Sequence, residues 1–189
     1  FAETGTFFAN TDRFFHKWMR DVRDSQGETG AFPGVSPAAQ YGAELMRLGW
    51  ADAGIIVPWT IWKQFDDPTI IDENWEAMNR FMQHVNETKY DHMTLIKEND
   101  HYQWADWLSY EPLETCSNLA FDDNGKRKPD AVTYWNYLSA CYWQIDAEMM
   151  RDMAKATGRD GSKYQEMAET AKAYLKDNFL NSDGTLKTP

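Results

Sequence analysis

The apolar residues of this 189-residue chain recur every three to four positions along most of its length. Over residues 6–23, for example, Phe15, Trp18, Met19 and Val22 fall on one face of a helix. This spacing is typical of an amphipathic α-helix, whereas a half-buried strand would alternate every second residue. No segment shows that alternation clearly, so the sequence predicts an all-α fold.

The same spacing predicts four further helices, and the five together predict antiparallel helical hairpins. Asp67-Pro68 suits a helix start, because aspartate caps well and proline fits the first helical position. Ser162-x-x-Gln165 predicts a capping box, and Pro58 predicts a kink or a late start. Two long irregular regions, residues 25–48 and about 90–128, separate the helices. The four further ranges are 52–65, 68 to about 89, 130 to about 157, and 162 to about 179.

Charge and motif content exclude several classes of function. The formal net charge of −11 argues against a nucleic-acid partner that binds through a basic face. No apolar run approaches the roughly 20 residues of a membrane-spanning helix, so no membrane partner is expected. The four histidines form no H-x-x-x-H pair, and no glycine-rich phosphate loop is present. We therefore expect neither a metal site nor a cofactor.

A tryptophan-alanine-aspartate triplet occurs twice, ending at Asp52 and at Asp106, and the second copy is followed by Trp107. Each copy places an indole, Trp50 or Trp104, beside a carboxylate. This pairing suits a sugar, whose C–H faces stack on aromatic rings and whose hydroxyls need acceptors. The alternatives are that the indoles fill the core and that Asp52 only caps a helix. Capping explains Asp106 less well, because it lies outside any helical pattern.

Several short blocks together resemble one enzyme family, the bacterial α-L-rhamnosidases of glycoside hydrolase family 78. The resemblance extends from about Phe1 to about Leu186. Its most specific parts contain Gly-Trp-x-Asp-Ala with a following Val-Pro-Trp, and Asp-Trp-Leu. The blocks are Phe15-x-x-Trp18-Met19-Arg20-Asp21, Gly30-Ala31-Phe32-Pro33, Gly49-Trp50-Ala51-Asp52-Ala53, Val57-Pro58-Trp59-Thr60 and Asp106-Trp107-Leu108.

The resemblance implies an (α/α)6 barrel that removes terminal L-rhamnose with inversion. Inversion requires one carboxylic acid and one carboxylate base, roughly 6.5–9.5 Å apart. The family's acid-glutamate motif precedes the region that matches Phe1, and its base glutamate follows the region that matches Pro189. By this resemblance, residues 1–189 form a single segment of the catalytic barrel, incomplete at both ends and inactive alone. The rest of the same polypeptide is then the expected partner.

The resemblance also implies a ligand, a rhamnose-containing glycan or glycoside. The predicted sugar-binding wall consists of Trp50, Asp52, Trp104, Asp106 and Trp107, and the catalytic residues are expected elsewhere. One departure concerns the family's Val-Pro-Asp stretch, where this chain has Gly34 in place of the aspartate. That change leaves open a different sugar in a related toroid enzyme. A non-catalytic carbohydrate-binding helical domain is a second alternative.

Overall fold

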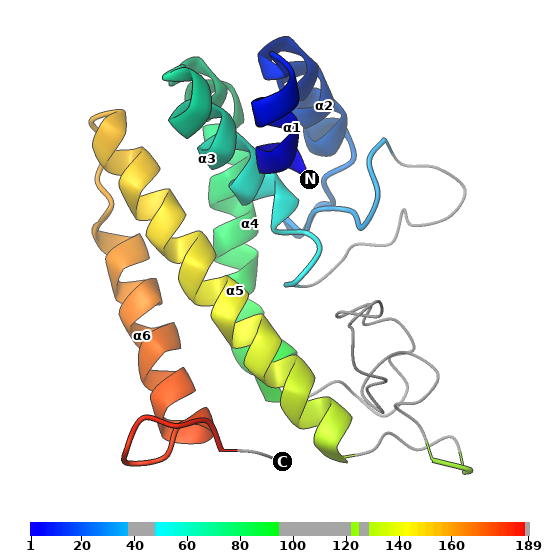
Figure 1. Ribbon diagram of the computed structural model, residues 1–189, viewed down its shortest axis with the longest axis vertical. Helices are drawn as coiled ribbons and strands as arrows, with labels where there is room; N and C mark the ends of the chain where they lie inside the picture. Colours follow the sequence, from blue (N-terminus) through cyan, green and yellow to red (C-terminus); the bar gives the residue numbers. More distant parts are fainter. Residues whose placement is uncertain (38–47, 95–121, 125–128, 188–189) are drawn as a thin grey trace.

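The chain folds into helices joined by turns and irregular segments (Figure 1). The computed structural model describes residues 1–37, 48–94, 122–124 and 129–187. Within these residues there is no β-strand, and Leu180 and Leu186 form an isolated bridge. The all-α prediction is therefore confirmed. The helices are α1 (Ala2–Phe8), α2 (Asp12–Asp24), α3 (Ala53–Phe65), α4 (Thr69–Thr94), α5 (Pro129–Ala156) and α6 (Ser162–Phe179).

Helix α3 occupies the centre of the arrangement, since it contacts α1, α2, α4 and α5. Helices α5 and α6 lie side by side and run in opposite directions as a long hairpin (Figure 1). Helix α4 packs against both α3 and α5 and so joins the hairpin to the N-terminal helices. None of the helices in the described residues is both long and apolar enough to cross a bilayer.

One hydrophobic core runs through α2 to α6, as the helical spacing predicts. Met19, Ile55, Phe81, Trp143 and Tyr164 represent these five helices, and each is at most 1% exposed. Trp143 and Tyr164 are the largest of the fully buried side chains. Their burial explains the regular apolar spacing of the two long C-terminal helices.

The predicted single helix over residues 6–23 is wrong, because the chain breaks there into α1 and α2. Ala9 is extended, with φ −154° and ψ 156°, and ends α1. The side chain of Asn10 then accepts a hydrogen bond from the backbone N–H of Asp12 at 3.3 Å. Short polar side chains of this kind compete with helical backbone hydrogen bonds. The run of polar residues after Ala9 therefore outweighs the continuous apolar spacing.

Of the helix starts predicted at Asp67 and at Ser162, the structure has the predicted cap only at Asp67. The Asp67 carboxylate accepts hydrogen bonds from the backbone N–H and the hydroxyl of Thr69, at 2.9 and 2.7 Å, so the predicted cap is confirmed. The predicted capping box at Ser162 is wrong. Ser162 is the first helical residue, and its N–H donates to the Asp160 carboxylate at 2.9 Å. The Gln165 side chain instead accepts from Arg151.

Pro58 neither delays nor interrupts α3, which begins at Ala53 and continues through the proline. Next to it, Gly54 lies against the ring of Phe32. A Cβ at position 54 would approach three ring carbons of Phe32 to 2.2–2.8 Å, which is too close for any side chain. Phe32 also packs on Phe81 with ring centroids 5.0 Å apart. The Phe32 ring therefore locks the segment after α2 onto both α3 and α4.

Polar contacts hold the same segment from the other side. The Arg80 guanidinium of α4 donates to the carbonyls of Gly27 and Glu28 at 3.0 and 3.1 Å. Gly30 has φ +96°, and a Cβ there would lie 2.5 Å from the Arg80 carbonyl oxygen. The start of the predicted irregular region is thus a firmly packed part of the structure, and it requires glycine at this close approach.

Candidate functional site

The turn that leads into α3 carries the first Trp-Ala-Asp triplet. Gly49 has φ +103°, a left-handed conformation that glycine adopts without strain. The Asp52 carboxylate accepts a hydrogen bond from the backbone N–H of Gly49, on the upstream side of the turn. Asp52 occupies the N-cap position, but its side chain makes no capping hydrogen bond to α3. Side-chain capping therefore does not explain this aspartate.

A hollow of about 590 Å³ opens beside this turn, between helices α1, α2, α3 and α5. Its walls are rich in aromatic side chains, with Asp52 as a buried acid and Trp50 half-buried. The Trp18 indole is fixed there by a hydrogen bond from its Nε1 to the Ser36 carbonyl at 2.9 Å. The residues that line the hollow include Phe1, Glu3, Phe15, Trp18, Trp50, Asp52, Thr60 and Tyr142.

Asp52 forms a buried pair with Asp146 of α5, one helical turn beyond Tyr142. The two residues are 1% and 0% exposed. Burial raises the pKa of both carboxyls, because it penalises their charged forms. The pKa of Asp146 is raised further by the charge of Asp52 and by its hydrogen bond to that carboxyl.

The raised pKa of both carboxyls favours a single proton shared between them. Apart from the contact between the two acids, both Asp146 oxygens and Oδ1 of Asp52 lack hydrogen-bond partners. Two adjacent carboxylates cannot both stay ionised without water, so the one with the higher pKa keeps its proton. Asp146 is that acid, and its O–H donates to Asp52. Asp52 also accepts from the Gly49 N–H, which links α5 to the turn that carries Trp50.

The predicted sugar-binding residues are only partly within the described structure. Trp50 and Asp52 both line the hollow. Trp104, Asp106 and Trp107 fall in residues 95–121, outside the described residues, so a shared cleft stays a prediction.

Sequence reasoning missed Asp146, although the sequence carries a signal for it. Asp146 interrupts a stripe of α5 in which Trp143, Ala147 and Met150 are all 0% exposed. A lone acid on a buried helical face needs a partner, because burying an unpaired charge is costly. The apolar spacing of the helix could therefore have identified this residue.

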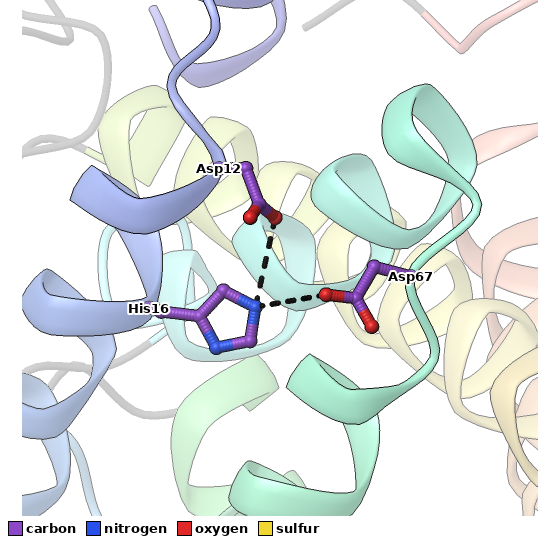
Figure 2. A group of neighbouring side chains, drawn as sticks. All are labelled: Asp12, His16 and Asp67. Atoms are coloured by element: carbon purple, nitrogen blue, oxygen red, sulfur yellow. Dashed lines mark ion pairs between the residues drawn. The ribbon is translucent and has the colours of Figure 1, made fainter.

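A second group of acids lies beyond the other end of α3 (Figure 2). His16 Nε2 of α2 faces Asp12 Oδ1 at 3.6 Å and Asp67 Oδ2 at 3.4 Å. The other ring nitrogen, Nδ1, lies 3.0 Å from Glu73 Oε2. None of these four residues lines the hollow. Sequence reasoning missed this group because only Asp12 and His16 have helical i, i+4 spacing.

Comparison with known proteins relates this helical architecture to a family. The family model for the bacterial α-L-rhamnosidase six-hairpin glycosidase domain matches residues 1–189. The chain belongs to this family. The described helices thus form part of the six-hairpin, or (α/α)6, domain of the family, as the resemblance implied.

Curated relatives named α-L-rhamnosidase match this chain over only part of their own lengths. An α-L-rhamnosidase of Formosa agariphila is 27% identical over 96% of this chain, and another of Streptomyces avermitilis is 24% identical over 99%. The matched regions are 18% and 16% of those proteins. The chain therefore spans less than a fifth of these relatives.

Solved structures show the same fold. The S. avermitilis α-L-rhamnosidase, crystallised with L-rhamnose, matches 94% of this chain with a TM-score of 0.70 and 24% identity. The α-L-rhamnosidase of Dictyoglumus thermophilum matches 92% with a TM-score of 0.70 and 20% identity. This chain covers 15% and 17% of those structures.

Proposed function

We propose that residues 1–189 form part of the rhamnose-binding wall of an inverting α-L-rhamnosidase. Trp50 stacks on the apolar face of the sugar, and Asp52 accepts a hydrogen bond from a sugar hydroxyl at the floor of the hollow. The observation that carries this proposal is that both residues line one aromatic-walled hollow. Family membership and a relative crystallised with L-rhamnose support the choice of sugar.

The contact between Asp52, which lines the hollow, and the buried Asp146 supports a binding role rather than acid–base catalysis. In an inverting enzyme the acid and base stand roughly 6.5–9.5 Å apart, which leaves room for the attacking water. Asp52 and Asp146 instead hydrogen-bond directly to each other. We therefore assign the catalytic acid and base to other parts of a longer polypeptide, and hydrolysis to that polypeptide rather than to residues 1–189 alone.

Trp104, Asp106 and Trp107 belong to the same proposal as further members of the wall. A hydrogen bond to an ionised acceptor contributes roughly 1.5–3 kcal/mol where water is excluded. Each aspartate that meets a hydroxyl in this way would then discriminate strongly against a sugar that lacks it.

The test replaces Asp52 in the complete enzyme by Asn, which keeps an oxygen for the Gly49 N–H and removes the charge. We expect kcat/KM for an aryl α-L-rhamnoside to fall tenfold or more, because a charged acceptor is lost. The melting temperature should change little. Asp177→Asn, on the exposed face of α6, is the matched control and should leave kcat/KM unchanged.

Two results would overturn the assignment. If D52N keeps kcat/KM within twofold of wild type, Asp52 stabilises the turn before α3 and does not bind sugar. If the unmodified enzyme hydrolyses another aryl glycoside faster than the rhamnoside, the sugar is wrong even though the wall is correct.

A further inference from the structure

We propose that Asp12, His16 and Asp67 bind a divalent transition-metal ion, with Zn²⁺ best suited to the site. The ligand atoms are Asp12 Oδ1, His16 Nε2 and Asp67 Oδ2, which all lie within 4.8 Å of one another (Figure 2). They come from the first two turns of α2 and from the connection between α3 and α4. The ion would fasten these parts together.

The distances within the group fit a shared ion better than direct hydrogen bonds. His16 Nε2 lies 3.6 and 3.4 Å from the two carboxylate oxygens, beyond the usual 2.7–3.2 Å of an N–H···O bond. Ligands about 2.1 Å from a metal ion in tetrahedral geometry lie about 3.4 Å from each other. The two separations from His16 Nε2 therefore match those of ligands on one ion, and the two carboxylate oxygens lie within 4.8 Å of each other.

The Glu73 carboxylate prepares the histidine for this role. It lies 3.0 Å from His16 Nδ1, and a carboxylate accepts, so Nδ1 carries the hydrogen. In the neutral ring the lone pair is then on Nε2, the nitrogen that faces Asp12 and Asp67. A carboxylate behind a histidine in this manner is typical of metal sites, where it fixes the ring and makes the ligand more basic.

The two aspartates are also prepared. Asp67 Oδ1 is held by the backbone and hydroxyl of Thr69, so Oδ2 remains for the ion. Asp12 Oδ1 is shielded from solvent and has no hydrogen-bond partner. A cation between the three ligand atoms would compensate the desolvation of that oxygen.

Charge and ligand type select the kind of ion. Within the described residues, the ion pairs of Asp12, Asp67 and Glu73 all go to His16, so three carboxylates surround one imidazole. Ca²⁺ and Mg²⁺ prefer all-oxygen ligands, whereas an imidazole nitrogen favours Zn²⁺ and its neighbours in the first transition row. Three protein ligands leave a position for water.

The test counts Zn²⁺ bound to the complete polypeptide after metal removal with EDTA and dialysis against Zn²⁺. We expect the wild-type protein to hold one more Zn²⁺ per chain than His16→Gln or Asp67→Asn. His84→Gln removes an imidazole from α4, outside the group, and should hold as much as wild type. Glu73→Gln should weaken binding about tenfold or more, as loss of such a supporting carboxylate usually does.

Stability gives a second measurement that does not depend on the number of other sites. Zn²⁺ should raise the melting temperature of the stripped wild-type protein by about 3 °C or more, and D67N should lose this shift. D67N retains an oxygen for Thr69, so it should fold even if H16Q does not. Equal Zn²⁺ content in wild type, H16Q and D67N would overturn the proposal. A stripped protein that is stabilised by acid and unaffected by Zn²⁺ would also overturn it, since a proton then takes the place of the ion.

Discussion

The two ends of α3 carry two groups of acids that relieve charge repulsion in different ways. At the N-terminal end, Asp52 and Asp146 are buried, and their raised pKa values favour a shared proton. Beyond the C-terminal end, Asp12 and Asp67 keep some exposure and face the His16 imidazole. Burial thus determines how the repulsion between the acids is relieved, because two carboxyls that are shielded from water cannot both remain charged.

The difference also predicts opposite responses to pH. At the buried pair the pKa of Asp146 is raised, whereas hydrogen bonds from Thr69 lower the pKa of Asp67. Increasing pH therefore removes the stabilisation that Asp146 contributes, and decreasing pH removes the stabilisation that Asp67 contributes. Variants at each end of α3 can test this contrast.

Asp146→Ala should have the largest effect. It removes the hydrogen-bond donor to Asp52 and leaves a cavity among Trp143, Ala147 and Met150. We expect a loss of about 2–4 kcal/mol in the free energy of unfolding, measured by denaturant titration of the complete polypeptide. A loss below about 1 kcal/mol would show that the pair is not buried as described.

Asp146→Asn should be milder and should change the pH dependence. The Asn amide donates to Asp52 as the protonated acid does, but it cannot ionise. The pKa of an aspartate in an unfolded chain is about 3.9, and the pKa of Asp146 is raised in the folded protein. The wild-type protein therefore loses stability as the pH rises above about 3.9. D146N should therefore gain stability relative to wild type between about pH 4 and pH 7. Parallel melting curves across this range would contradict the shared proton.

Asp67→Asn should have the smallest effect in the absence of metal. Asparagine also caps helices, and partly exposed ion pairs contribute little, so we expect a loss of at most about 1 kcal/mol at pH 7. Because the pKa of Asp67 is lowered in the folded state, this loss should disappear as pH falls through that pKa. Thermal melts of the metal-free protein at several pH values would measure it. A loss larger than that of D146A would reverse the comparison.

The fold was largely predictable because apolar spacing dominates in long helices. The hairpin of α5 and α6 follows from buried residues such as Trp143 and Ala171 and from Gly158, which adopts φ +70° after α5 ends. The break between α1 and α2 was missed because Phe8 continues the apolar spacing. Phe8 is in fact 86% exposed, so its position in the pattern carried no packing information.

The candidate sites were less predictable, because each joins residues far apart in the sequence. The aromatic-acid triplet directed attention to Trp50 and Asp52, which line the hollow, and their role in sugar binding stays a prediction. The partner of Asp52 is on α5, and its identity depends on how the helices pack. The group around His16 likewise needs the connection after α3 to return to α2. Spacing along a single helix cannot encode either arrangement.

The contact between Gly54 and the Phe32 ring has a consequence for how this region can evolve. Any side chain at position 54 would occupy the volume of that ring, so the two positions can change only together. A relative with alanine at position 54 must hold a smaller residue at position 32, or move the whole segment away from α3. Because α3 begins beside Asp52, such a pair of substitutions would act on the turn that carries Asp52, although neither position lines the hollow.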